Sequence, residues 1–214
     1  MADSKFKYIG EGIVGAAAIA VALLTPLLQA RRARWGATDA EVQHSLPGDD
    51  LVPHPKVGYT YAITINTPAA KIWPWLVQIG QGRGGFYSYE FLENMVGCQI
   101  HNADRIIPGF QHLEVGNGVR LHPIAPPLPV AAIEPGRVIV LYAGKYAQNA
   151  ITWVFFLDEL DEGTTRLIAR FRFDCKPSLG NMLGYSFFLE PISCLMQRKM
   201  LLGIKQRAEA TTGN

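Results

Sequence analysis

The side chains best suited to chemistry lie in one short segment, from Gly80 to Arg105. His101 and Asp104 stand three residues apart, and a carboxylate that orients an imidazole can create a general base. Tyr87 and Tyr89 precede them, and a tyrosine hydroxyl can orient a ligand oxygen or donate a proton to an enolate. The segment therefore predicts either an acid–base site formed by these four residues or a polar network that only supports the loop.

Other residues could hold a ligand without reacting with it. Arg83 could bind an anionic ligand head, and His122 lies near the end of an expected strand, from which it could point into a cavity. Methionines on an expected C-terminal helix could shape a pliable apolar pocket. The predicted ligand-binding set is Arg83, Tyr87, Tyr89, His101, His122, Met196 and Met200, and a structural role remains the alternative for each.

Three glycines in the same segment, Gly80, Gly82 and Gly85, fit the G-x-G-x-x-G pattern of dinucleotide sites. Their context argues against that function, because a helix is expected before them and an antiparallel sheet after them, whereas the nucleotide site needs a βαβ unit. A loop that gates the mouth of a pocket explains the glycines better. The sequence also lacks esterase, zinc-protease and P-loop motifs and any familiar metal-ligand spacing, so we expect neither a cofactor nor a metal.

The composition limits the classes of function. With 214 residues, 49% of them hydrophobic, the chain can form one domain with a sizeable core and an appendage. A formal net charge of +2, with scattered basic residues, argues against binding to nucleic acid. The three cysteines are widely spaced and form no C-x-x-C pair, which indicates neither a disulfide framework nor a zinc site.

The N-terminal segment, residues 1–35, carries a strong membrane signal. Ile9 to Leu28 is almost uninterruptedly apolar, and twenty helical residues span roughly 30 Å, the thickness of a bilayer core. Lysines precede this run and a cluster of arginines follows it, which favours a cytoplasmic C-terminal domain. A cleaved signal peptide and a soluble helix are the alternatives, although arginines stand where a signal would be cleaved.

The next elements alternate between strand and helix. Residues 36–58 are polar and rich in proline, which predicts a connector. Tyr59 to Ile65 has the β-branched and aromatic alternation of a strand, and Ala69 to Ile79 has helical spacing after a proline start. A second short helix is expected from Tyr87 to Val96, with Phe91, Leu92 and Met95 on its apolar side.

The second half of the chain predicts an antiparallel meander followed by a long helix. Turn residues such as Pro135-Gly136 separate successive alternating segments. The expected strands are Gly118–His122, Val130–Glu134, Arg137–Tyr142, Ile151–Leu160 and Thr164–Asp174. The helix from Tyr185 to Ala208 places Ile192, Met196, Met200 and Ile204 on one side, and this apolar side requires a surface to cover.

One strand, two short helices, a curved antiparallel sheet and a long final helix make an α+β fold in which the sheet wraps around the last helix. The segments WPWLVQIGQGRGGFYSYEFLENMVGCQIHNADRI and MQRKMLLGIKQRAE resemble a bacterial branch of the SRPBCC superfamily, also called START-like, which includes polyketide cyclases and dehydrases. The resemblance covers residues 59–208 and implies a helix-grip fold with a hydrophobic ligand pocket. It brings no set of catalytic residues.

These observations predict a START-like domain over residues 59–208, followed by a tail, 209–214. We expect it to bind or transfer a lipid, quinone or polyketide-like molecule, and a cyclase or dehydratase using the same pocket is the alternative. Residues 1–35 would anchor it to the bacterial inner membrane with the domain in the cytoplasm. An unidentified protein partner or anionic lipid could instead bind the basic side of the last helix, at Arg198, Lys199, Lys205 and Arg207.

Overall fold

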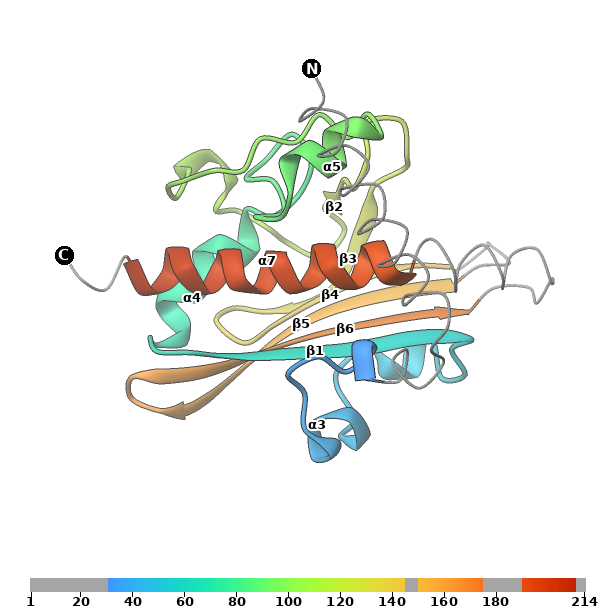
Figure 1. Ribbon diagram of the computed structural model, residues 1–214, viewed down its shortest axis with the longest axis vertical. Coiled ribbons are helices and arrows are strands. Elements are labelled where there is room, and N and C mark those ends of the chain that lie inside the picture. Colours follow the sequence, from blue (N-terminus) through green and yellow to red (C-terminus); the bar gives the residue numbers. More distant parts are fainter. Residues whose placement is uncertain (1–30, 145–149, 175–189, 211–214) are drawn as a thin grey trace, which may run out of the picture.

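The computed structural model describes residues 31–144, 150–174 and 190–210. The long helix α7 (Glu190–Ala210) lies along one face of a curved antiparallel sheet, and the short helix α3 (Asp39–Gln43) lies on the opposite side (Figure 1). The predicted membrane segment falls almost wholly outside the described residues. Within the described residues, no helix has both the length and the apolar content needed to cross a membrane.

Six strands form one sheet in the order β1-β6-β5-β4-β3-β2, with every neighbouring pair antiparallel. The first strand thus pairs with the last one, and β1 and β2 form the two edges of the sheet. The strands are β1 (Val57–Ile65), β2 (Gly118–Val119), β3 (Leu128–Glu134), β4 (Val138–Ala143), β5 (Ala150–Asp161) and β6 (Thr164–Asp174). This sheet with its C-terminal helix confirms the predicted α+β, helix-grip architecture.

Two predicted elements are shorter than expected. The strand predicted to run to His122 ends at Val119, because the chain then turns through a proline-rich stretch that offers few backbone N–H groups for pairing. The helix predicted from Tyr87 is α5 (Glu90–Met95). Tyr87 has a φ of 58°, in the left-handed region, so it cannot belong to that helix.

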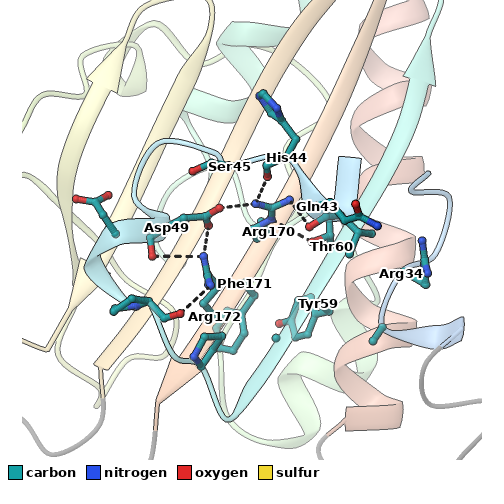
Figure 2. A pocket seen from close by; sticks show the side chains of 16 residues that line it. Arg34, Gln43, His44, Ser45, Asp49, Tyr59, Thr60, Arg170, Phe171 and Arg172 are labelled. Atoms are coloured by element: carbon teal, nitrogen blue, oxygen red, sulfur yellow. Dashed lines mark hydrogen bonds and ion pairs between the residues drawn. The ribbon is translucent and has the colours of Figure 1, made fainter. Parts of the chain in front are cut away.

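The connector is held against the outer face of the sheet by arginines of β6. Successive side chains of a strand alternate between its two faces, so Arg166, Arg170 and Arg172 all point outward. Arg170 pairs with Asp49 at 2.5 Å and donates to the carbonyl oxygen of His44 at 2.8 Å (Figure 2). Arg166 pairs with Glu41 of the connector at 2.6 Å. The groove of about 630 Å³ beside them is thus lined by arginines already bound to the protein.

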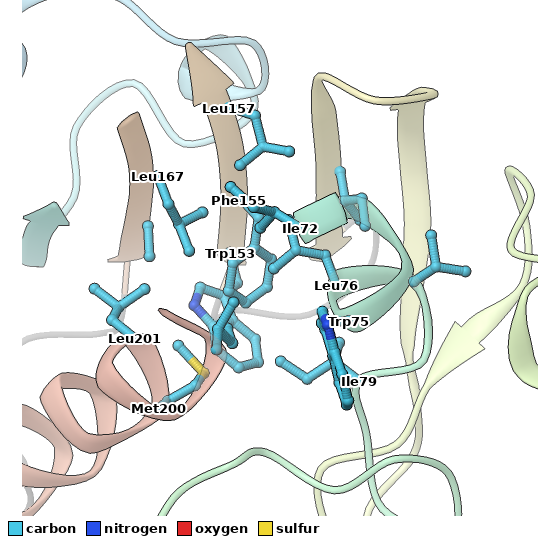
Figure 3. Close-up of a cluster of buried hydrophobic side chains, with 14 of the residues drawn as sticks. Ile72, Trp75, Leu76, Ile79, Trp153, Phe155, Leu157, Leu167, Met200 and Leu201 are labelled. Carbon is cyan, nitrogen blue, oxygen red and sulfur yellow. The ribbon is translucent and has the colours of Figure 1, made fainter. Parts of the chain in front are cut away.

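The inner face of the sheet packs against α7 and α4 (Ala69–Val77) in the main hydrophobic core. Figure 3 shows Ile72 and Leu76 of α4 beside Phe155 of β5, with Leu201 of α7 nearby. All four side chains are less than 2% exposed. This close packing covers the part of the sheet nearest α4. The space that it leaves between the sheet and α7 lies toward the start of α7.

Candidate functional site

A cavity of about 350 Å³, open to the surface on one side, lies between the sheet, α5 and the first half of α7. We call it the inner cavity. Its wall is mostly apolar, with a few polar groups. The lining residues are Tyr59, Phe86, Ser88, Glu93, Leu121, Ile151, Trp153, Phe171, Ile192, Ser193, Met196, Gln197 and Met200.

The strand residues of the wall follow from the alternation of the sheet. On β6 the arginines occupy the outward positions, so Phe171 between them must point inward. It stacks on Tyr59 of β1 with ring centroids 4.8 Å apart. Trp153 of β5 faces the same side and contacts Phe86 at 6.2 Å between ring centroids. Four aromatic rings therefore form much of the cavity wall.

Glu93 is the only carboxylate among the described residues of this wall. Glu93 is only 7% exposed, although it lies on the six-residue helix α5. Burial raises the pKa of Glu93 to about 7, and the neighbouring Glu90 carboxylate contributes to the increase. A carboxyl group with this pKa can give up or accept a proton near neutral pH.

The orientation of α5 is the reverse of the one predicted. Phe91 and Met95, expected to face the core, are 74% and 68% exposed, and Glu93 is buried instead. Hydrogen bonds at both ends fix the helix: Glu90 accepts from the backbone of Asn102 at 2.5 Å, and the Asn94 side chain binds both backbone groups of Ile100. These bonds to the following loop turn the carboxylate inward.

Three polar atoms of the wall have no hydrogen-bond partner in the part of the chain that the structure describes. They are Glu93 Oε2, Trp153 Nε1 and Gln197 Oε1. The Gln197 amide is held in place, because its Nε2 donates to Tyr59 Oη at 2.7 Å. Ser88 Oγ is already satisfied by the carbonyl oxygen of Met196 at 2.9 Å. Buried polar atoms are nearly always paired in proteins, so three such atoms on lining residues of one cavity are polar groups that the described residues leave without a partner.

Tyr87 and Tyr89 do not line the inner cavity. Tyr87 is buried, its hydroxyl donates to the carbonyl oxygen of Trp75 at 2.9 Å, and burial raises its pKa well above the ordinary value. Tyr89 is 39% exposed, with the Lys199 ammonium 5.7 Å from its ring centroid. Both tyrosines thus support the surrounding structure.

His101 and Asp104 are exposed and also lie outside the cavity wall. Asn102, which lies between them in the sequence, organises the loop instead. Asn102 Oδ1 accepts from the backbone N–H groups of Phe86 and Tyr87, at 3.0 and 2.6 Å, and its amide nitrogen donates to another backbone carbonyl. The predicted polar cluster therefore contains a structural network, and neither His101 nor Asp104 lines the inner cavity, although Asp104 lines two open hollows elsewhere on the surface.

The remaining predicted residues divide between structural contacts and the cavity. Arg83 donates to the carbonyl oxygens of Val77 and Phe110 at 3.1 and 2.9 Å, and burial lowers its pKa. His122 Nε2 lies 3.0 Å from a backbone oxygen of the α5 terminus. Met196 and Met200, in contrast, line the inner cavity. The sequence did not point to Glu93, Trp153 and Gln197.

Within residues 31–144, 150–174 and 190–210 there is no cluster of three or more histidine, cysteine or acidic residues suited to a metal ion. The basic residues of α7 have contacts of their own. Lys205 Nζ donates to the carbonyl oxygen of Thr64 at 2.7 Å, and Arg207 donates to that of Ala103 at 2.8 Å. Arg198 and Lys199 lie over the rings of Trp35 and Tyr89.

No family model and no curated protein matches this chain. Solved structures that do match include a protein from Mesorhizobium loti, with 16% identity, a TM-score of 0.38, and coverage of 71% of this chain and 98% of that one. The Zhui aromatase/cyclase from a Streptomyces species has 13% identity, a TM-score of 0.38, and coverage of 73% and 95%. A norcoclaurine synthase from Thalictrum has 12% identity, a TM-score of 0.38, and coverage of 73% and 96%.

At these identities the likeness concerns the fold alone. The order of elements described above, with a curved antiparallel sheet against a long C-terminal helix, is that of the helix-grip fold. The helix-grip fold predicted from the sequence is thus confirmed by the order and pairing of the elements themselves.

Proposed function

We propose that this protein binds a small, largely apolar molecule in the inner cavity. The observation that carries the proposal is the cavity itself, about 350 Å³ in volume and walled mainly by aromatic and aliphatic side chains. Protein interiors normally contain few voids larger than a water molecule, whereas ligand sites range from about 300 to 1,000 Å³ and are mostly apolar with a few polar groups. The inner cavity has the size and chemical character of a ligand site.

The same proposal includes transfer of the ligand to or from a membrane. Ile192 lines the inner cavity and is also 55% exposed, so the wall reaches the surface at the start of α7. Phe91, Met95 and Val96, at the nearby α5, are each at least 68% exposed. The predicted anchor in residues 1–35 would hold this apolar surface near a bilayer, with the domain on the cytoplasmic side, where a lipid or quinone could pass directly into the cavity.

A second candidate function is catalysis in the same cavity, of the cyclase or dehydratase type. One observation favours it: the pKa of Glu93, which burial raises to about 7, suits a general acid or base near neutral pH. Glu93 would take the catalytic role that the sequence suggested for His101 and Asp104.

The binding proposal can be tested on the full-length protein. Mass spectrometry of the organic extract should detect a co-purified apolar molecule, and an apolar fluorescent probe should compete with it for the protein. The substitution Ser193→Trp places a large ring in the cavity and should reduce probe binding at least about tenfold. Leu202→Trp, on the same helix but outside the cavity wall, is the matched control.

Unchanged probe affinity in folded Ser193→Trp, together with an extract that contains no apolar molecule, would rule the proposal out. The enzymatic candidate needs a further result. Conversion of a bound molecule by the wild-type protein but not by Glu93→Gln would support it, and equal conversion by both proteins would remove Glu93 from the mechanism.

A further inference from the structure

The described wall of the inner cavity contains an acidic side chain but no basic one. Of its thirteen lining residues, Glu93 alone carries a formal charge when ionised, and none is lysine, arginine or histidine. The nearby groups that influence Glu93 add no positive charge, since they are the Glu90 carboxylate and the Cys98 thiol. Tyr59 is the other titratable residue in the wall. An ionised Glu93 therefore has no positively charged side chain in the described wall to balance it.

The unpartnered polar atoms favour a ligand that donates hydrogen bonds. Glu93 Oε2 and Gln197 Oε1 are both acceptors, and among the described residues of the wall Trp153 Nε1 is the only unpartnered donor. In the structure Gln197 Nε2 donates to Tyr59 Oη, and Oε1 is the atom of this amide that has no described partner. A hydrogen bond between an ammonium group and a carboxylate is roughly twice as strong as one between neutral groups.

The aromatic side chains favour the same kind of ligand. Tyr59 stacks on Phe171, and Phe86 lies against Trp153, so that four aromatic rings line the space that also contains the Glu93 carboxylate. The face of an aromatic ring carries partial negative charge, which attracts a cation placed over it, most strongly when the cation is removed from water. Aromatic rings with one acidic group are thus suited to an organic cation.

We propose that the inner cavity selects apolar molecules that carry a cationic amine over the same molecules with a hydroxyl or a carboxylate. This inference rests on the proposed binding function and specifies the class of its ligand. An amine would pair with Glu93 and could also donate to Gln197. A hydroxyl could satisfy one acceptor but would leave the charge of Glu93 unbalanced, and a carboxylate would add a second negative charge to a site with one free N–H donor.

The test compares three molecules that share one skeleton and differ in the polar group: a naphthylethylamine, the corresponding naphthylethanol and naphthylacetate. Their affinities for the full-length protein are measured by isothermal titration calorimetry at about pH 8, where Glu93 is mostly ionised and the amine is mostly protonated. We expect the amine to bind at least about tenfold more tightly than the alcohol, and the carboxylate to bind most weakly.

Glu93→Gln keeps the shape of the side chain and removes its charge. It should weaken the amine about tenfold while the alcohol stays within about threefold, which also shows that the variant is folded. Glu162→Gln, an exposed carboxylate in the turn between β5 and β6, is the matched control and should leave all three affinities unchanged.

Equal affinities for the amine and the alcohol in the wild-type protein would overturn this inference and leave the binding proposal intact. An unchanged amine affinity in folded Glu93→Gln would overturn it as well. If none of the three molecules binds and the organic extract is empty, the binding proposal fails and this inference fails with it. The comparison on the wild-type protein needs no variant, so misfolding of Glu93→Gln cannot leave the question open.

Discussion

Replacing Glu93 with glutamine should stabilise the unliganded protein above neutral pH. Burial raises the pKa of Glu93 from an ordinary value of 4.5 to about 7, so the folded state resists ionisation of this group. Each pKa unit corresponds to about 1.4 kcal/mol, and the difference between 4.5 and about 7 therefore amounts to about 3 to 4 kcal/mol at high pH. Glutamine has the same shape and does not ionise.

The direction of the pH dependence follows from the raised pKa. Below about pH 4.5 the carboxyl group is protonated in both the folded and the unfolded chain, and it costs no stability. As the pH rises toward 7, the unfolded chain releases the proton first, so the free energy of unfolding decreases and then levels off. The stability of Glu93→Gln relative to the wild type should therefore increase by about 2 to 3 kcal/mol between about pH 5 and pH 8.

Urea denaturation followed by tryptophan fluorescence measures this difference at both pH values. Glu162→Gln serves as the control, because Glu162 is exposed and its replacement should show little pH dependence relative to the wild type. If the stability difference between Glu93→Gln and the wild type is the same at pH 5 and pH 8, Glu93 has an ordinary pKa, and the reasoning about the inner cavity is refuted.

Two further substitutions test the packing of the domain outside the inner cavity. Arg170→Ala should destabilise the protein by about 3 kcal/mol in urea denaturation, because it breaks a buried ion pair. Arg137→Ala breaks an exposed ion pair and should change stability by less than about 1 kcal/mol. Equal effects of the two substitutions would contradict the anchoring of the connector by Arg170. Gly203→Ala should lower the free energy of unfolding by at least about 2 kcal/mol, since a Cβ there would collide with the backbone of Tyr87. Gly109 has open space around it, so Gly109→Ala should change stability by no more than about 0.5 kcal/mol. An unchanged stability of Gly203→Ala would show that the helix can move away from Tyr87.

Much of the fold could be predicted from the alternation of side chains. Tyr59–Ile65 and Thr164–Asp174 carry β-branched and aromatic residues at alternate positions, and the structure pairs these two segments along their length. Periodicity reports which positions face the core, and it does so for long elements. It says less about short ones: β2 is two residues long, and the start of α5 depends on the backbone conformation of Tyr87.

The candidate site was harder to predict, because loop contacts determine it. Met196 and Met200 could be assigned to the pocket from the helical spacing of the last helix. Glu93 could not, since a single carboxylate between Phe91 and Met95 has the pattern of a solvent-facing residue. Only hydrogen bonds between α5 and the loop after it turn Glu93 inward, and such bonds leave no periodic signal in the sequence.

The two halves of α7 differ in how deeply they are packed, and the close approach of Gly203 to Tyr87 lies in the second half. Every buried side chain among its described residues lies at Met200 or beyond, where contacts with Thr64 and Ala103 also secure the helix. The residues that line the inner cavity run from Ile192 to Met200, and all of them except Met200 lie in the other half. This half is also held by contacts, since the Met196 carbonyl oxygen accepts from Ser88 and Gln197 donates to Tyr59, but none of its described side chains is fully buried. A bulky guest in the inner cavity would therefore press on the less deeply packed half of α7 and leave the core packing beyond Met200 in place.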